Sequence, residues 1–263
     1  KNKDNGYFEA RYVRRNNDYF IAYISSQNGC KQACRLCHLT ASKQTMDEMA
    51  TTEDILTQAR EVLDYHSHQD IKPPLVHFNF MARGEPLVNP YILNNFDEIY
   101  NGLKSLSEEY GLAFKIKIST IIPESVTDLG FLNKPHVDVY YSLYSLKDSF
   151  RKRWIPKGLN PEKTGKLLQK IDSLILHHTY IKGENDNLTD VYDILSWLER
   201  YNLNANLNIV RYNPFDDKRG CESDESVIHN LVSEMSKSSY IKKHKIVQRV
   251  GFDVFASCGM FIV

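Results

Sequence analysis

Residues 19–37 read YFIAYISSQNGCKQACRLC, and the interpretation of the whole chain begins with this stretch. Its first part, Tyr19–Ser25, is rich in aromatic and β-branched residues and predicts a buried strand. Cys30, Cys34 and Cys37 follow in a C-x3-C-x2-C spacing. Three thiolates can hold three irons of a 4Fe–4S cubane and leave the fourth iron without a protein ligand. The sequence therefore predicts a strand followed directly by an iron–sulfur loop.

A zinc site is the alternative for the same loop, with His38 as a fourth ligand beside the three cysteines. Structural zinc sites usually have two separated ligand pairs, whereas Cys37 and His38 are adjacent, so we favour the cluster. The chain has five cysteines, an odd number. This count and the crowding of three cysteines in one loop favour a reducing compartment and a metal site over a disulfide framework.

The composition limits the possible partners. The chain has 263 residues, enough for one sizeable core, and its 33 Lys and Arg balance its 33 Asp and Glu. A protein that grips a long nucleic acid usually has an excess of basic residues, so any such substrate must be held by local patches. The candidate patches are Arg11–Arg15, Lys147–Lys157 and Lys242–Arg249. No apolar stretch is long enough for a membrane helix and no signal peptide opens the chain, so we expect a cytoplasmic protein that does not associate with a membrane.

Short β-branched or aromatic runs alternate with helical patterns along the chain. We expect strands at 19–25, 75–80, 114–119, 137–142, 176–181, 204–212 and 246–250. We expect helices at 52–65 (opened by Thr51 and Thr52), 91–110, 124–130, several segments from 143 to 173, 189–201 and 223–236. Six βα units predict an α/β fold with a parallel sheet, a partial (β/α)6 TIM-like barrel. A doubly wound open sheet is the alternative.

Reactive groups in such barrels sit just beyond the C-terminal ends of the strands. The three cysteines follow the first expected strand, and Gly84-Glu85-Pro86 follows the second. Ser119 ends the third expected strand, Ser142 ends the fourth and Asn213 follows the sixth. These chemically useful residues are therefore expected at one end of the barrel.

Several motifs in order resemble the RlmN/Cfr family of RNA adenosine methyltransferases, which are radical S-adenosylmethionine (SAM) enzymes. They are Ser25-Ser26-Gln27-x-Gly29-Cys30, Gly84-Glu85-Pro86-Leu87-x-Asn89, Ile118-Ser119-Thr120, Ser142-Leu143-Tyr144, Arg151-x-x-Trp154-Ile155-Pro156, Asn213-Pro214-Phe215 and Ala256-Ser257-Cys258-Gly259. The match covers residues 9–263. We therefore expect a radical SAM core domain at 19–263, with a C-terminal cysteine loop, after an N-terminal extension or hairpin at 1–18. The family's accessory N-terminal domain is expected to be lacking.

The resemblance implies two cofactors, the 4Fe–4S cluster and SAM. Glu85 offers a carboxylate to the SAM ammonium group, and Gly84 allows close backbone approach. The other expected SAM contacts are Ser119, Ser142, Asn213 and Tyr144, which replaces a family histidine. The strand-end residues Ser119, Ser142 and Asn213 have a structural alternative, a role in capping. The implied partners are RNA as substrate and a reductant such as flavodoxin or ferredoxin, and we expect a monomer.

The resemblance also implies a catalytic cysteine, Cys258, which accepts a methyl group from a first SAM. A radical made from a second SAM then activates that methyl group for addition to an electron-poor ring carbon. The alternative for Cys258 is a small buried apolar residue. The family's second catalytic cysteine corresponds to Tyr23, whose phenol cannot act as a soft nucleophile.

Two further residues have weaker assignments. Cys221 is the only spare thiol that could replace the missing cysteine, and it is otherwise an incidental exposed cysteine. Glu9 resembles the family's general base, and its alternative is a solvated carboxylate on an early hairpin. Two other functions remain open for the whole chain. One is a radical SAM enzyme of another reaction type acting on a nucleotide, DNA or a protein. The other is a zinc-stabilised binding protein without catalysis.

Overall fold

The computed structural model describes residues 7–248 of the chain. They fall into two compact units, each of which is assembled from separate segments. The first unit comprises residues 7–31, 45–120 and 131–139, and the second comprises residues 32–44, 121–130 and 140–248. The strand β5, Val137–Ser142, contributes residues to both units.

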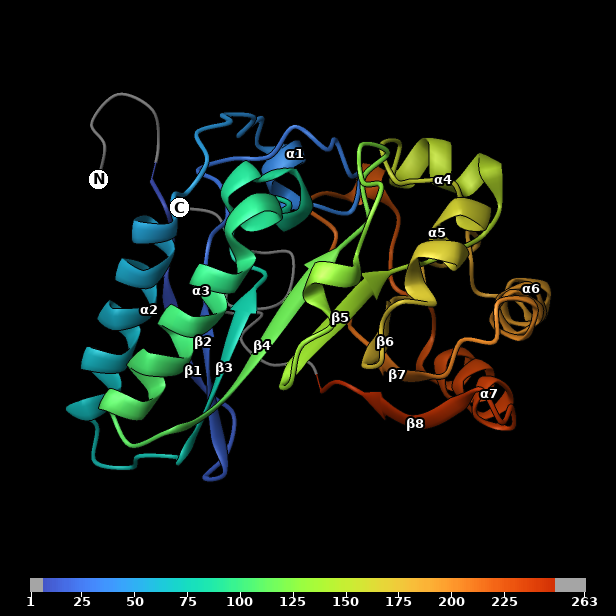
Figure 1. Ribbon diagram of the computed structural model, residues 1–263. Helices are drawn as coiled ribbons and strands as arrows, with labels where there is room; N and C mark the ends of the chain where they lie inside the picture. The colour runs from blue at the N-terminus through green and yellow to red at the C-terminus, as the bar shows by residue number, and fades with distance from the viewer. Residues whose placement is uncertain (1–6, 249–263) are drawn as a thin grey trace. The chain divides into compact units, whose positions relative to one another are not determined.

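The first unit is a sheet with two helices along one face (Figure 1). The strands β1 (Arg11–Arg14), β2 (Tyr19–Tyr23), β3 (Leu75–Phe80) and β4 (Ala113–Thr120) are neighbours in that order. β1 is antiparallel to β2, whereas β2, β3 and β4 are parallel. The helices α2 (Thr52–Ser67) and α3 (Pro90–Glu109) provide the connections that parallel pairing requires.

Both helices begin at side chains that satisfy the exposed N–H groups of the first turn. Thr51 Oγ1 accepts a hydrogen bond from the Asp54 N–H at 3.1 Å, and Asp54 accepts one from the Thr51 N–H at 2.8 Å, which completes a capping box. Asn89 Oδ1 accepts from the Tyr91 N–H at 2.8 Å. The start predicted for α2 is confirmed, and that predicted for α3 is confirmed to within one residue.

Asn89 also ties α3 to the segment before the first cysteine of the motif. Its Nδ2 donates to the carbonyl oxygens of Ser26 and Ala50, both at 2.8 Å, and the residue is completely buried. One asparagine therefore caps a helix and holds two other backbone segments.

Close packing joins the helices to each other and to the sheet. A Cβ atom on Gly102 of α3 would lie 2.7 Å from Leu56 Cδ1 of α2, so the glycine permits the two helices to approach closely. The ring of Phe20 on β2 stacks on His66 of α2, with ring centroids 3.9 Å apart. Phe20 therefore points from the sheet toward the helices.

In the second unit β6 (Leu174–His178), β7 (Ala205–Ile209) and β8 (Ile241–Ile246) pair in parallel. Its helices are α1 (His38–Ala41), α4 (Asp148–Trp154), α5 (Pro161–Leu168), α6 (Leu188–Arg200) and α7 (Glu225–Ser236). A cluster of Phe150, Trp154, Ile181 and Tyr212 forms part of its core.

Some predicted elements were wrong in position or type. The segment expected as a helix near 124–130 forms a turn, in which the Val126 N–H donates to the Pro123 carbonyl at 3.0 Å. Residues 124–128 read ESVTD, and short polar and β-branched residues are weak helix formers. A 3-10 turn, η2 (Gly130–Leu132), follows this segment.

The strand expected at 246–250 is instead β8, which begins five residues earlier. Residues 242–245 of β8 are all exposed and read KKHK, so the strand lacks the alternating apolar pattern that sequence reasoning depends on. Similarly, β6 begins two residues earlier and ends three residues earlier than the strand predicted at 176–181.

Within residues 7–248, no helix combines the length and the apolar composition needed to cross a membrane.

The first prediction concerns His178, which is only 1% exposed on β6. Burial lowers the pKa of His178 from 6.5 to about 4, with Asp190 opposing and His177 adding to the shift. Because the folded protein binds this proton less readily than the unfolded chain, the contribution of His178 to stability is present above pH 6.5 and is lost as the pH falls toward 4. We expect this residue to lower the free energy of unfolding by on the order of 2 kcal/mol between pH 7 and pH 5.

Urea unfolding at the two pH values measures this loss. His178→Gln should show a smaller decrease than the wild type, whereas His244→Gln, at an exposed position on β8, should show the wild-type decrease. Equal decreases for His178→Gln and the wild type would contradict the prediction.

The second prediction concerns Asn89. Asn89→Ala removes two hydrogen bonds to buried carbonyl oxygens and the cap of α3. We expect it to lower the free energy of unfolding by about 2–3 kcal/mol, as measured by urea titration. Asn101→Ala, at an exposed position of the same helix, is the control and should change stability by less than about 0.5 kcal/mol. Similar effects of the two variants would show that the buried network contributes little.

Candidate functional site

The cysteine motif runs from one unit into the other. Cys30 belongs to the first unit and is buried, whereas Cys34 and Cys37 belong to the second and are partly exposed. Within each unit, the described residues contain no group of three or more His, Cys, Asp and Glu side chains that could hold a metal ion. The assignment of the three cysteines as ligands remains a prediction from their spacing.

In the first unit, side chains from distant segments hold the residues that lead to Cys30. The Ser25 N–H donates to Gln58 Oε1 at 2.8 Å, and Ser25 Oγ donates to the Glu9 carbonyl at 2.7 Å. The Asn28 N–H donates to the Glu48 carbonyl at 3.2 Å. The segment from Ser25 to Asn28 is completely buried, so its path is determined by the folded unit rather than by local sequence.

Gly84 packs directly against this segment. Its φ angle is +97°, and a Cβ atom there would lie 2.5 Å from Ser26 Oγ and 2.8 Å from the backbone nitrogen of Gln27. Any other residue would clash with backbone as well as with a side chain. The next residue strengthens the contact, because the Glu85 N–H donates to Gln27 Oε1 at 2.8 Å.

Glu85 has a structural function in addition to its predicted one. Its Oε1 accepts a hydrogen bond from the Leu87 N–H at 3.0 Å and so caps the 3-10 helix η1, Pro86–Val88. The side chain is buried, 5% exposed. Contact with the SAM ammonium group remains a prediction for this carboxylate.

Glu9, predicted as a general base, lies in a buried ionic group. Its carboxylate forms an ion pair with Arg11 and lies 3.9 Å from Nη1 of Arg83. Arg83 is 1% exposed, stacks on the ring of Tyr7 at 4.7 Å, and donates from Nε to the Asn28 carbonyl at 3.1 Å. Glu9 is therefore buried and ion-paired rather than solvated. Its function as a base is untested.

Arg83 stands beside Gly84, and the sequence pattern indicates no function for it. Its guanidinium group joins the Glu9 segment to the backbone just before Cys30. A charged residue next to a glycine on a loop normally suggests an exposed position, and no sequence signal indicated its burial.

The remaining predicted SAM contacts lie at strand ends or in loops. Ser119 is the penultimate residue of β4 and is partly exposed, and Ser142 is the last residue of β5 and is buried. Tyr144 has a φ angle of +56°, and its ring packs against the cluster that contains Phe150 and Trp154. The Tyr144 carbonyl accepts a hydrogen bond from Asn185 Nδ2 at 2.7 Å.

In the second unit His38 links the cysteine motif to Asn213. His38 Nε2 lies 3.0 Å from the Asn213 carbonyl oxygen, and the His38 ring contacts the edge of the Phe215 ring with centroids 5.3 Å apart. Burial lowers the pKa of His38, the bond to Asn213 opposes this shift, and Arg219 adds to it. His38 follows Cys37, so this contact brings the motif beside Asn213-Pro214-Phe215, as the barrel prediction requires.

Arg35 ties the same motif to the loop that bears Cys221. The Arg35 N–H donates to the Trp154 carbonyl at 2.8 Å, and Arg35 Nη2 donates to the Lys218 carbonyl at 2.6 Å. Arg219 Nη1 returns a bond to the Arg35 carbonyl at 3.1 Å. The Cys221 carbonyl accepts from the Lys182 N–H at 3.0 Å, and Cys221 itself is exposed. Hydrogen bonds therefore hold the backbone of this polar loop at several points.

Of the two positions that correspond to the family's catalytic cysteines, 258 and 23, the structure describes only position 23. Cys258 lies outside the described residues. Tyr23 is the last residue of β2 and is 8% exposed.

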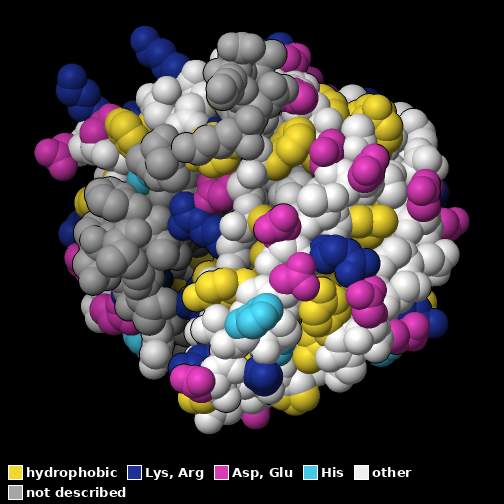
Figure 2. All heavy atoms as spheres, turned by 90° about the vertical axis from the view of Figure 1, so that its left-hand side faces the viewer, with side chains coloured by type: hydrophobic (Ala, Val, Ile, Leu, Met, Phe, Trp, Pro, Cys, Tyr) yellow, Lys and Arg dark blue, Asp and Glu magenta, His cyan; other side chains and the backbone are white. Residues whose placement is uncertain are grey.

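The surface charge agrees with the neutral composition. On the face that Figure 2 shows, Lys and Arg side chains are interspersed with Asp and Glu. Ion pairs also involve the predicted basic patches, since Lys147 pairs with Asp190 and Arg153 with Glu184.

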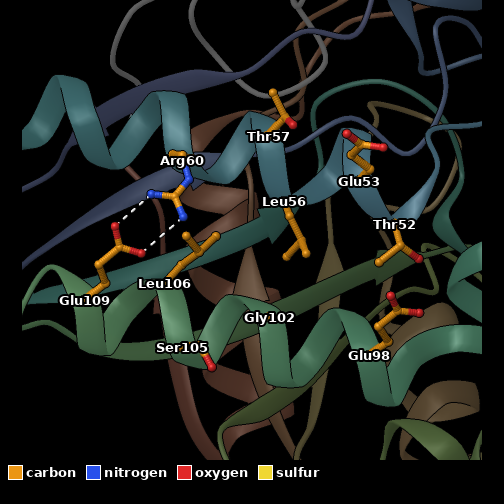
Figure 3. A pocket seen from close by; sticks show the side chains of 10 residues that line it. All are labelled: Thr52, Glu53, Leu56, Thr57, Arg60, Glu98, Gly102, Ser105, Leu106 and Glu109. Atoms are coloured by element: carbon orange, nitrogen blue, oxygen red, sulfur yellow. Dashed lines mark hydrogen bonds and ion pairs between the residues drawn. The ribbon is translucent and has the colours of Figure 1, made fainter.

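A groove of about 390 Å³ lies between α2 and α3 (Figure 3). The ion pair of Arg60 with Glu109 closes one end, with Nη–Oε distances of 2.8 and 3.1 Å. Leu56 and Leu106 line its middle. None of the predicted site residues within 7–248 lines this groove.

Comparison with known sequences finds related proteins over almost the whole chain. The chain is 26% identical over 272 residues to a dual-specificity RNA methyltransferase RlmN of Sulfurovum, covering 98% of this chain and 70% of that protein. It is 26% identical over 253 residues to RlmN of Oleidesulfovibrio alaskensis, covering 90% and 66%. A probable RlmN of Bacteroides fragilis is 25% identical over 272 residues, covering 98% and 72%. No family model matches the chain.

Comparison with solved structures identifies the fold. A radical SAM methyltransferase from Sphaerobacter thermophilus matches 98% of this chain and 74% of its own, with a TM-score of 0.75 and 18% identity. Streptococcus suis SuiB bound to its precursor peptide SuiA matches 91% of this chain and 54% of its own, with a TM-score of 0.55 and 14% identity. The predicted partial α/β barrel of the radical SAM type is therefore confirmed, and so is the resemblance of the sequence to the RlmN/Cfr family.

Proposed function

We propose that this protein is a radical SAM methyltransferase that acts on a base carbon of RNA, with adenine as the base, through a methylated Cys258. The observation that carries the proposal is the C-x3-C-x2-C motif directly after β2, with Gly84 packed against the residues that lead to it. The similarity to RlmN proteins over 90–98% of the chain supports RNA as the substrate class. The chain spans 66–72% of the length of these relatives, so the activity of the whole proteins is part of the proposal.

The chemistry of the donor set fits a 4Fe–4S cluster. Cys30, Cys34 and Cys37 would bind it as thiolates and leave one iron for SAM. When bound, the reduced cluster supplies the electron that cleaves SAM. The protein's own contribution is to fix the loop, which Gly84, Gln27 and the buried network around them do in the first unit.

SAM would be held by short polar side chains at the ends of the strands. The side chains and backbone positions predicted for this contact are Gly84, Glu85, Ser119, Ser142, Tyr144 and Asn213. The buried carboxylate of Glu85 suits the ammonium group of SAM, because a charged hydrogen bond is stronger where water is excluded.

The methyl group would pass through Cys258. Cys258, as the thiolate, would form a bond from its sulfur to the methyl carbon of a first SAM while the sulfonium–methyl bond breaks, and S-adenosylhomocysteine would leave. Glu9 would serve as the base that removes a ring proton at a later stage. Release of a covalent intermediate is assigned to Cys221, because Tyr23 occupies the position of the family's second cysteine.

The proposal also includes the compartment, the reductant, the oligomeric state and the domain bounds of the enzyme. We assign it to the cytoplasm, with a flavodoxin or ferredoxin as reductant, and to the monomeric state. Residues 1–18 would form an extension that precedes a core domain at 19–263. The antiparallel pairing of β1 with β2 supports a hairpin within that extension and the first strand.

The third prediction tests the cluster. Replacing Cys30, Cys34 or Cys37 by Ala should prevent reconstitution of about four irons per chain and abolish SAM cleavage. Iron and sulfide assays, with the electron-paramagnetic spectrum of the reduced protein, measure the first effect. Cys221→Ala is the matched control and should retain the cluster. A single motif variant that keeps both iron and SAM cleavage would overturn the assignment.

The fourth prediction tests Cys258. Incubation with SAM alone should add one methyl group to Cys258, because this transfer is a polar displacement that needs no reductant. Intact-mass and peptide spectra detect the group. Cys258→Ala should form no methylated RNA, whereas Cys221→Ala should still become methylated and then accumulate a protein–RNA adduct. Methylated RNA from Cys258→Ala would exclude the methyl-carrier route.

A further inference from the structure

The sheet of the first unit has a polar face on the side away from α2 and α3. Phe20 contacts His66 of α2, so the alternate residues Tyr19 and Tyr23 of β2 point the other way. Tyr19 stacks on His77 of β3, with ring centroids 4.4 Å apart, which places His77 on this second face as well. We call it the inner face of the sheet.

Strand pairing arranges polar residues in rows across the inner face. Tyr23 on β2 is paired with Asn79 on β3, and Asn79 is paired with Lys117 on β4. Two residues earlier on the same two strands, His77 is paired with Lys115. Neighbouring residues in register on parallel strands point to the same side, so these side chains share the inner face.

Two of these side chains are buried with polar atoms that have no hydrogen-bond partner. Asn79 is 4% exposed and its Oδ1 has no partner, while its Nδ2 lies 3.8 Å from the Met81 sulfur. His77 is 7% exposed, and neither ring nitrogen has a partner. Buried polar atoms are nearly always paired in folded proteins. These atoms therefore indicate a polar ligand that completes the inner face.

The charge of the inner face indicates an anionic ligand. Burial, with smaller contributions from Lys117 and Lys115, lowers the pKa of His77 to about 3, so its imidazole is neutral and can donate one hydrogen bond and accept one. The Ile116 N–H donates to the His136 carbonyl at 2.8 Å, which places Asp138 beside Lys117 in the parallel pairing. Two lysines and one aspartate leave one net positive charge among these residues.

We propose that the inner face binds one nucleoside phosphate of the substrate. Lys115 and Lys117 bind the phosphate, and Asn79 and His77 bind hydroxyl or amino groups of the ribose or base. This inference rests on the proposed function and deepens it, because it names the residues that select a nucleotide. Ser119 lies two residues beyond Lys117 on the same face, about 7 Å further along β4, so the nucleotide would lie next to the predicted SAM contact.

Titration calorimetry of the holoenzyme with AMP, adenosine and SAM tests the proposal without requiring turnover. AMP should bind more tightly than adenosine to the wild type. Lys117→Met should weaken AMP binding about tenfold or more and leave adenosine binding little changed, because only the phosphate contact is lost. Asn79→Leu should weaken both ligands. SAM binding should be unchanged in both variants.

Two further variants serve as controls. Lys104→Met removes the same charge from an exposed site on α3 and should bind AMP as the wild type does. Lys117→Arg keeps the charge and should retain AMP binding, which separates loss of charge from damage to the fold. A thermal melt of each variant checks its folding, and Lys117→Gln replaces Lys117→Met if the latter does not fold.

Several results would overturn the proposal. These are absence of AMP binding to the wild type at millimolar concentration, equal AMP affinity in the wild type and a folded Lys117→Met, and a parallel loss of SAM affinity. The last result would mean that the lysines bind the SAM carboxylate. AMP binding that follows the predicted pattern in an enzyme that never methylates RNA would support the inner-face site and contradict the proposed function.

Discussion

The close approach of Gly84 to the backbone of Ser26 and Gln27 is the constraint on which the site of the first unit depends. There is no space for a Cβ atom at position 84, and its positive φ is one that other residues rarely adopt. This contact places the loop after β3 against the loop after β2. The buried amide of Asn89 and the guanidinium group of Arg83 then join further segments to the same backbone.

The second unit uses different chemistry for the same purpose. Arg35 and His38 lie on either side of Cys37, and each contacts a backbone carbonyl of the segment after β7. The aromatic cluster around Trp154 supports Arg35, whose guanidinium group lies 5.3 Å from the Trp154 ring centroid. In the first unit distant side chains hold the backbone of the motif region, whereas in the second unit side chains of the motif region hold the backbone of distant loops. Both kinds of contact are sensitive to geometry.

Sequence reasoning succeeded where local signals determine structure. Thr51 is a local start signal, and α2 begins directly after it. The start of α3, at Pro90, lies within one residue of the predicted position. The predicted position of β8 was wrong, because its exposed lysines do not alternate with apolar residues. The helix predicted near residues 124–130 was also wrong, because a turn forms there instead. The placement of strand-end residues followed from the barrel rule, but the second functions of Glu85 and Tyr144 did not. The hydrogen bond that Glu85 accepts from the Leu87 N–H and the left-handed backbone at Tyr144 are local features, but the spacing of the motifs does not reveal them.

Arg35 and Lys218, in the loop of residues 216–221, contribute different kinds of atom to their contact. Arg35 contributes its side chain, whereas Lys218 contributes only its carbonyl oxygen, and the Arg219 carbonyl likewise accepts a bond from the Tyr212 hydroxyl at 2.5 Å. At position 218 the protein therefore recognises the path of the loop and not the side chain, whereas Arg219 also uses its side chain, which bonds the Arg35 carbonyl. Over evolutionary time the identity of residue 218 is free to drift, while insertions, deletions or a proline that redirects the chain would be selected against. A loop of constant length that varies at position 218 and retains Arg219 is the signature that these contacts should leave among descendants of this gene.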